Sequence, residues 1–171
     1  IVQLVKKYVT PDRLKLNQCV ELACSTIAPV ASLGFEWAKT RPVQGDADLD
    51  ALLPLTQAGV KTVRQPATEW LAGLMLLNES PRMPERVREL LDSAFDDVRS
   101  QALTLMQKDK RFGESQLLWA AMAESPWSEV REAMVAQLSE RQAIYAPETL
   151  RAVWATSLLA IHRGGRAKRA V

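Results

Sequence analysis

Arginine side chains recur along this 171-residue chain at a spacing that suits anion binding. Each stands four positions after an apolar residue, and in three cases directly after a valine. The four are Arg64, Arg99, Arg131 and Arg163. Guanidinium groups lined up on one surface would bind phosphate or carboxylate groups through paired N–H donors. These arginines are therefore candidate ligand-binding residues.

A second cationic cluster follows the last of these arginines. Arg166, Lys168 and Arg169 lie beside a Gly164-Gly165 pair. Positive charge and free backbone N–H groups before a helix start can hold a phosphate. The alternative is an ordinary turn between helices, followed by a helix with a solvated charged face. Both interpretations stay open at this point.

An acidic triplet, Asp46-x-Asp48-x-Asp50, resembles the opening of a calcium loop. The rest of that motif is missing, because Ala51 stands where the sharp-turn glycine is needed and Gln57 where the bidentate glutamate belongs. We therefore interpret the triplet as acids that favour the positive end of a helix dipole.

The remaining reactive side chains are few. Cys19 and Cys24, five positions apart on one expected helix, point in directions too different to share a metal. We expect Cys19 to be a small core residue, and His162, the one histidine, to be a turn residue. No phosphate-binding loop, nucleophile elbow or zinc-protease motif is present. We expect no metal, no cofactor and no catalytic residues, so an enzyme is not favoured.

The arginines recur because the sequence itself repeats every 32 to 35 residues. An apolar residue, here called position zero, is followed three places later by valine and then usually by arginine. Internal periodicity of this length is typical of stacked helical arrays. The five copies begin at Ile27, Val60, Phe95, Trp127 and Leu159.

Columns of apolar residues predict two helices in each repeat. Eight residues before position zero stand Cys19, Leu52, Val87, Trp119 and, as an exception, Arg151; five before it stand Leu22, Leu55, Leu90, Met122 and Trp154. These spacings return to one face of a first helix. The small residues seven places after position zero, Gly34, Ala67 and Ala102, would let a second helix approach its neighbours closely. We expect Trp119, Trp127 and Trp154 to be packed in these columns.

Prolines, acids and polar connectors mark the helix ends. Thr10-Pro11-Asp12, Met83-Pro84-Glu85 and Ala146-Pro147-Glu148 are typical of helix starts. The connectors expected are 40–46, 78–83 and 108–114. The sequence predicts about ten helices in antiparallel pairs, forming one array over residues 1–171. The repeats span approximately 10–40, 46–77, 84–108, 114–141 and 147–171, and we expect the array to be a piece of a longer chain.

Two turns carry a family resemblance, Ser93-Ala94-Phe95-Asp96-Asp97-Val98-Arg99 and Ser125-Pro126-Trp127-Ser128-Glu129-Val130-Arg131. This pattern resembles the HEAT repeats of armadillo-like α-solenoids, over about residues 10 to 163. The first repeats depart from it, since Pro29, Thr62 and Ala31 replace the two acids and an arginine. The resemblance implies an all-α superhelix of about five helix pairs, with the second helices on a concave face.

The arginine column also has a structural interpretation. A cation at the start of the second helix faces the wrong end of that helix's dipole. An acid two residues earlier, Asp97 or Glu129, could pair with the arginine of the same or the adjacent repeat. Such a ladder, resembling what the HEAT family uses to set stacking, is favoured over an anion-binding stripe.

Composition limits the function classes. Net charge is +2, from 22 basic and 20 acidic residues, so no strong overall field attracts polyanions. Two cysteines without a Cys-x-x-Cys motif favour a reducing, cytoplasmic setting, and no apolar run is long enough to span a membrane.

We expect a non-catalytic scaffold that binds another protein through the exposed face of the second helices. The residues expected on that face are Glu36, Gln65, Glu69, Gln101, Thr104 and Glu132. The alternative is a nucleic-acid-binding array, resembling the HEAT-like DNA glycosylases, that uses the arginine column and the basic C-terminal segment. An enzyme similar to the HEAT-like chromophore lyases is the least favoured. The partner and the oligomeric state stay undetermined.

Overall fold

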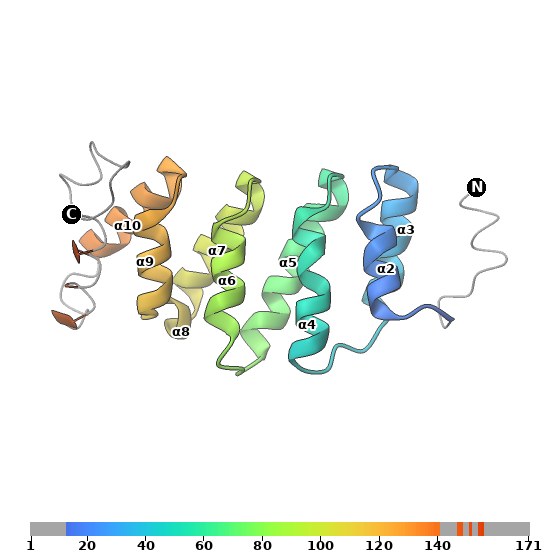
Figure 1. The fold of residues 1–171 in the computed structure, drawn as a ribbon, viewed down its shortest axis with the longest axis horizontal. Coiled ribbons are helices and arrows are strands. Elements are labelled where there is room, and N and C mark those ends of the chain that lie inside the picture. Colours follow the sequence, from blue (N-terminus) through green and yellow to red (C-terminus); the bar gives the residue numbers. More distant parts are fainter. Residues whose placement is uncertain (1–12, 141–146, 149–150, 152–153, 156–171) are drawn as a thin grey trace. The chain divides into compact units, whose positions relative to one another are not determined.

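The computed structural model describes residues 13–140, 147–148, 151 and 154–155. This part of the chain is helical and contains no strand, as Figure 1 shows. The all-α class expected from the sequence is therefore confirmed for these residues. None of their helices is long and apolar enough to cross a membrane.

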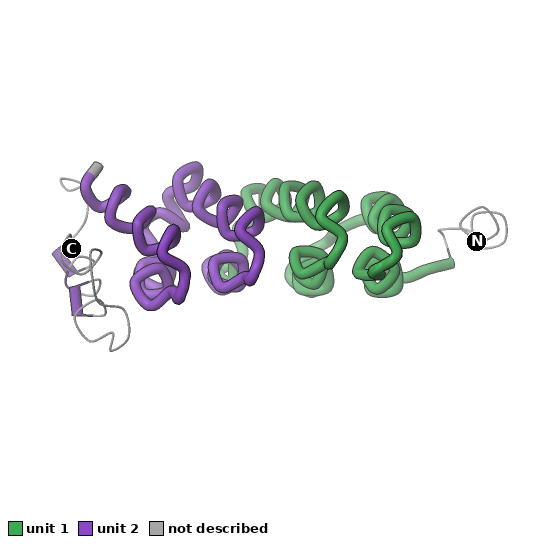
Figure 2. The backbone as a smooth tube through the Cα atoms, turned by 90° about the horizontal axis from the view of Figure 1, so that it is seen from above, with its two compact units in different colours: residues 1–83 green, residues 84–171 purple. Residues whose placement is uncertain are grey.

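The chain divides into two compact units, residues 1–83 and 84–171 (Figure 2). The described helices of the first are α2 (Leu16–Ala23), α3 (Ala28–Lys39), α4 (Asp46–Leu52), which continues as the 3-10 helix η2 (Leu53–Gln57), and α5 (Lys61–Leu77). Helix α2 pairs with α3, and α4 with η2 packs on α5. The two hairpins lie side by side, first helix against first helix and second against second (Figure 1).

The second unit is also helical in its described part. Its described helices are α6 (Met83–Leu91), α7 (Asp96–Lys108), the single turn α8 (Lys110–Gly113), α9 (Gln116–Glu124) and α10 (Ser128–Glu140). A short turn joins α6 to α7, and α9 packs on α10. The second helices α7 and α10 also contact each other. The described part of the second unit thus contains the helix pair α9–α10 and, before it, the consecutive helices α6 and α7.

The predicted columns form the core. The first-helix residues Leu52, Val87 and Trp119 are all 0% exposed, as are Leu55 and Leu90. On the second helices the same holds for the valine and small-residue columns, namely Val63, Val98, Val130, Ala67 and Ala102, each at most 1% exposed. Apolar periodicity therefore identified the buried face of both helices in each of these repeats.

The fifth repeat departs from the columns. Trp154 is 48% exposed and Arg151 is exposed, at positions that are fully buried in the three preceding repeats. The expectation that Trp154 packs in a core column is therefore wrong. Arg151 gives the physical reason, because a cation one turn away on the same helix face does not leave water without a partner.

The observed helix boundaries agree with those expected from the prolines, acids and polar connectors, except at one connector. Helix α4 begins at Asp46 and α6 at Met83, after non-helical connectors. The connector 108–114, expected to be a plain turn, contains the short helix α8. Its start is capped by Asp109, whose carboxylate accepts a hydrogen bond from the Arg111 backbone N–H at 2.9 Å. The helix start expected at Thr10-Pro11-Asp12 and the connector residue Ala146 lie outside the described residues.

A glycine sets the distance between α2 and α3. A Cβ atom added to Gly34 would lie 2.3 Å from the backbone nitrogen of Ala23 and 2.6 Å from the carbonyl carbon of Leu22. Backbone atoms cannot move aside as a flexible side chain would. Glycine at this position is thus what lets the first hairpin close.

Candidate functional site

The arginines of the repeated pattern make the same hydrogen bond in three successive repeats. The Nη1 atom of Arg64 donates to the carbonyl of Ala58 at 2.9 Å, and Arg99 donates to Ser93 at 2.8 Å. Arg131 donates to Ser125 at 2.6 Å. In each case the acceptor lies six residues earlier, in the turn between the two helices of one hairpin. We call this arrangement the arginine turn.

The arginine turn explains why a cation stands at the start of a second helix. Its guanidinium reaches back to the end of the first helix, where the last carbonyl groups have no partner within the helix. That end also carries the negative pole of the helix dipole, so positive charge is favourable there. Ala58 and Ser125 are the capping residues at the ends of η2 and α9. The arginine therefore donates a hydrogen bond to a carbonyl group at the end of the first helix. The dipole of the second helix is not what places it there.

Serine side chains also bind the backbone in the turns of three repeats, two of which are arginine turns. The hydroxyl oxygens of Ser25, Ser93 and Ser125 accept hydrogen bonds from the backbone N–H two residues later, at 3.2, 3.2 and 3.3 Å. Sequence reasoning missed this role, although the signal was present as serine two residues before position zero. The second repeat has Ala58 there and lacks the bond.

One arginine also joins two repeats. Arg99 donates from Nε to the carboxylate of Glu129 at 2.8 Å, and its Nη2 donates to the same oxygen. Its guanidinium carbon lies 4.0 Å from the centroid of the Trp127 ring. Trp127 and Glu129 belong to the next repeat, at position zero and two residues beyond it. This contact matches the pairing between adjacent repeats that the sequence predicts, and we call it the Arg99 clip.

The pKa of Glu129 is lowered from its ordinary value. The largest cause is a hydrogen bond from the residue's own backbone N–H, and the hydrogen bond and charge of Arg99 add to it. Partial burial and Asp96 oppose the shift. The Glu129 side chain is 49% exposed, so solvent screens the pair and limits its contribution to stability.

Burial argues against an anion-binding role for Arg64 and Arg99. Arg64 is 6% exposed and Arg99 is 5% exposed, while Arg131 is half-buried. A phosphate approaching from solvent would meet little of the first two guanidinium groups. The other candidate ligand-binding residues, Arg163, Arg166, Lys168 and Arg169, lie outside the described residues, as does His162.

The candidate protein-binding residues lie along the second helices. In the first unit Glu36, Gln65 and Glu69 are exposed on α3 and α5. Gln65 donates to Glu69 at 3.3 Å, and Glu36 pairs with Lys39 at 3.6 Å. In the second unit Glu132 of α10 is exposed, whereas Gln101 and Thr104 of α7 are half-buried.

The acidic triplet of α4 acts in helix capping and in contacts between segments. Asp48 accepts a hydrogen bond from the Gln44 backbone N–H at 2.6 Å. Asp46 accepts one from the Ser80 hydroxyl at 2.8 Å, and Asp50 accepts one from Arg82 at 3.3 Å. Both bonds tie α4 to the loop that precedes α6. Within the described residues no cluster of His, Cys, Asp and Glu has the arrangement of a metal site.

The cysteines show no sign of reactivity. Cys19 is fully buried, as expected. Cys24 borders a shallow groove of about 370 Å³ between α2 and α4, lined by Asn17, Val20, Glu21, Cys24, Ala51 and Pro54. Its thiol donates to the carbonyl of Pro54 at 3.4 Å, and burial raises the pKa of Cys24. The thiol therefore stays protonated, which disfavours nucleophilic chemistry.

The tryptophans serve packing, with Trp127 in an additional role. Trp119 is 0% exposed and donates from its indole nitrogen to the carbonyl of Gly113 at 2.8 Å. Trp37 is buried, and the half-buried Trp70 contacts Phe35 edge-on at 6.0 Å between ring centroids. Trp127, expected in a core column, is half-buried at the turn beneath Arg99. A turn residue meets solvent on one side, which the column pattern does not encode.

Comparison with known proteins gives no match to a family model, to a curated protein or to a solved structure.

Proposed function

We propose that this chain is a HEAT-like α-solenoid scaffold that binds another protein through the exposed face of its second helices. The observation that carries the proposal is the arginine turn. It recurs in three consecutive repeats and uses the most abundant cationic motif of the chain to hold helices rather than ligands. In the described part of the chain, the second helices carry exposed polar side chains that are available for binding.

The chemistry of that face suits a protein ligand. Glu36, Gln65 and Glu69 are exposed on two helices, α3 and α5, that pack against each other. Their side chains offer both hydrogen-bond donors and acceptors, and Lys39 adds a cation beside Glu36. A mixed polar surface of this kind is common in protein–protein interfaces that form and dissociate.

The nucleic-acid alternative has less support. Binding a polyanion requires several cations that neutralise phosphates together. Arg64 and Arg99 are more than nine-tenths buried and already donate to backbone carbonyls. That alternative therefore depends on Arg131 and on the basic segment Arg163, Arg166, Lys168 and Arg169.

Charge reversal on the second-helix face tests the proposal. The whole chain and its Glu36→Lys/Glu69→Lys variant are used for affinity capture, and captured proteins are compared. A matched control is Glu21→Lys, which changes an exposed glutamate of the same unit on the first helix α2. We expect a specific partner that the control retains and the double variant loses, while the helical circular dichroism of both is unchanged. A partner captured equally by both variants would contradict binding through this face.

A further inference from the structure

We propose that the groove between α2 and α4 binds an arginine side chain of a partner polypeptide. The stem of that side chain would lie on the apolar lining of the groove, and its guanidinium would pair with the carboxylate of Glu21. This inference rests on the proposed scaffold function and adds to it a second binding surface, on the first helices of the first unit, with a defined chemistry.

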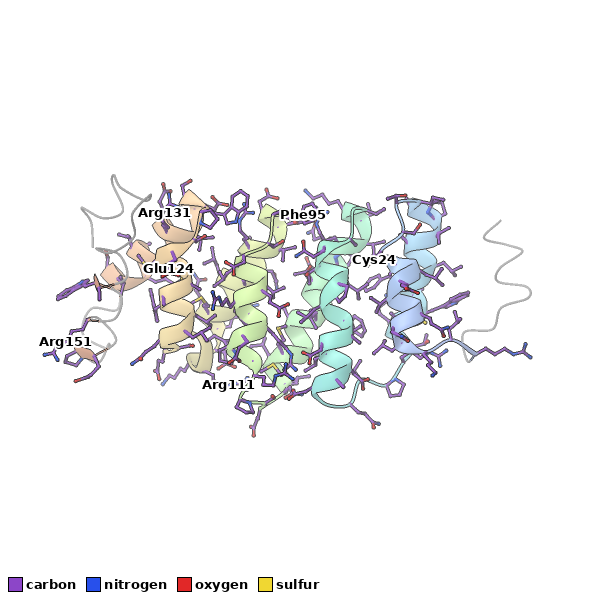
Figure 3. All side chains as sticks on the ribbon, in the orientation of Figure 1. Cys24, Phe95, Arg111, Glu124, Arg131 and Arg151 are labelled. Atoms are coloured by element: carbon purple, nitrogen blue, oxygen red, sulfur yellow. The ribbon has the colours of Figure 1, made fainter. Side chains whose placement is uncertain are left out.

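The groove is built by two consecutive repeats of the first unit. Its lining comes from α2 and the capping residue Cys24 on one side, and from α4 and η2 on the other. Helix α2 packs against both α4 and η2, and Figure 3 shows Cys24 on the side of α2 that faces α4. The Cys24 thiol donates to the carbonyl of Pro54 at 3.4 Å, which joins the two walls. The groove is therefore held in shape by contacts within one unit.

The groove is open to solvent. Its volume is about 370 Å³, and all six of its lining residues lie in the described part of the chain. Asn17, Glu21 and Pro54 are exposed, so no segment that the structure describes covers their side chains. A volume at the lower end of the range of small-ligand sites suits one long side chain better than a helix.

The lining has an apolar wall and a polar wall. Val20, Ala51 and Pro54 supply aliphatic surface, and Val20 is 4% exposed, which places it at the floor of the groove. Asn17 and Glu21 are four residues apart on α2, so their side chains are neighbours on one face of that helix. A ligand that is apolar along its length and a hydrogen-bond donor at its end matches both walls.

The charge of Glu21 selects the ligand. No residue that the structure describes forms an ion pair or a hydrogen bond with this carboxylate, whereas Glu36, Asp46 and Asp50 of the same unit all have partners. The acidic wall therefore favours a cation and disfavours an acidic or phosphorylated ligand. Arginine combines a cation with an apolar stem and a fork of N–H donors that matches a carboxylate.

Titration with a capped amino acid tests this inference. The probe is N-acetyl-arginine methylamide, added to the whole ¹⁵N-labelled chain while nuclear magnetic resonance follows the backbone amide signals. We expect saturable shifts centred on Asn17, Val20, Glu21, Cys24 and Ala51. The dissociation constant should be in the millimolar range, because a single small ligand has limited binding energy. The matched control, N-acetyl-citrulline methylamide, has nearly the same shape without the charge and should bind at least about threefold more weakly.

Variants of the groove separate its charge from its shape. Glu21→Gln should weaken binding of the arginine probe at least about threefold, because the carboxylate is lost. Ala51→Leu should also weaken it, because the larger side chain fills the groove. Glu79→Gln, which changes an exposed glutamate elsewhere in the first unit, should leave binding unchanged. The comparison with citrulline on the wild-type chain keeps the test valid if a variant unfolds.

Three outcomes would overturn the inference. The first two are absence of saturable shifts at the groove and equal binding of the arginine and citrulline probes. The third is much tighter binding to a Lys6→Gln/Lys7→Gln variant, which would show that the chain's own lysines occupy the groove. Failure here is distinguishable from failure of the proposed function. In the capture experiment a groove partner is lost by Glu21→Lys and retained by Glu36→Lys/Glu69→Lys, and a partner of the second-helix face behaves in the opposite way.

Discussion

The planar guanidinium group of Arg99 makes three different contacts. It donates to the Ser93 carbonyl, pairs with Glu129 and lies flat on Trp127. Lysine cannot replace it, because an ammonium group has no flat face and no fork of fixed donors. This explains why arginine rather than any cation recurs at the turn.

Removing the Arg99 clip should destabilise the chain. We expect Arg99→Met to lower the free energy of unfolding by about 2 kcal/mol, because the Ser93 carbonyl loses a charged donor in a buried setting. Glu129→Gln should cost about 1 kcal/mol or less, since that carboxylate is half exposed. Urea unfolding of both single variants and the double variant measures the coupling between them.

A control for this cycle is Arg88→Met. Arg88 and Asp92 form an ion pair on the surface of the same unit, with both side chains about half exposed, at 52% and 50%. The control should change stability little. Zero coupling between Arg99 and Glu129 would refute the clip as a link between repeats.

The ionisation of Glu129 makes stability depend on pH, through the hydrogen bond from its own backbone N–H and through Arg99. The pKa of Glu129 is lowered in the folded chain, so the folded state prefers the carboxylate more than the unfolded chain does. Its contribution is complete above the ordinary glutamate pKa of about 4.3 and is lost as the pH falls through the lowered value. We expect the stability difference between wild type and Glu129→Gln to shrink from pH 7 to pH 3 in urea unfolding. A difference that grows on acidification would be inconsistent with the lowered pKa.

Gln137 is a residue whose replacement should stabilise the fold. It is 3% exposed, and neither polar atom of its amide has a hydrogen-bond partner among the described residues. The same repeat position holds Trp37, Trp70 and Leu105 in the other repeats. We expect Gln137→Leu to raise the free energy of unfolding by about 1 kcal/mol, because it removes a buried amide without partners. Gln65→Leu, at an exposed site of α5, is the control. Equal changes in the midpoint of thermal unfolding for the two variants would contradict this prediction.

At the level of helices, close approach depends on small residues at fixed places. Gly34 and Gly73 provide a matched pair, since both lie inside second helices. We expect Gly34→Ala to destabilise by about 1–3 kcal/mol because its new methyl group meets the backbone of α2. A Cβ atom added at Gly73 has no neighbour within 4 Å. Gly73→Ala should therefore raise the free energy of unfolding by up to about 1 kcal/mol, because alanine has the higher helix propensity. Thermal unfolding in which Gly34→Ala is neutral would show that α2 and α3 are further apart.

The helices and their buried faces could be predicted because they depend on local periodicity. Leu52, Val87 and Trp119 recur at one register and are fully buried. The short helix α8 was missed because its signal is a single capping residue, Asp109, within a polar connector. Trp154 was misplaced because the column pattern does not weigh the charge of Arg151 beside it.

The arginine turn could be predicted only in part. The spacing indicated that Arg99 pairs with an acid of its own or the next repeat, and Glu129 of the next repeat is the partner. The bond to a carbonyl six residues earlier depends on how the chain reverses between helices, and apolar periodicity carries no information on that path. Serine at the start of the turn was the available sign, as at Ser93 and Ser125.

At the scale of the two compact units, each uses charged side chains for contacts between its own segments. In the first unit Asp46 and Asp50 hold the loop before α6 through Ser80 and Arg82. In the second unit the Arg99 clip joins the turn edges of consecutive repeats. These contacts use the chain's charges internally. They are consistent with the near-neutral net charge and with a surface for a protein rather than a polyanion.

The most direct test of this account is the titration of duplex and single-stranded DNA into the whole chain at two salt concentrations. The account predicts no binding at low salt, because Arg64 and Arg99 are engaged in the fold. Binding that is strong at low salt and falls steeply at high salt would contradict it. Loss of that binding when Arg163, Arg166, Lys168 and Arg169 are neutralised would establish a nucleic-acid-binding array instead.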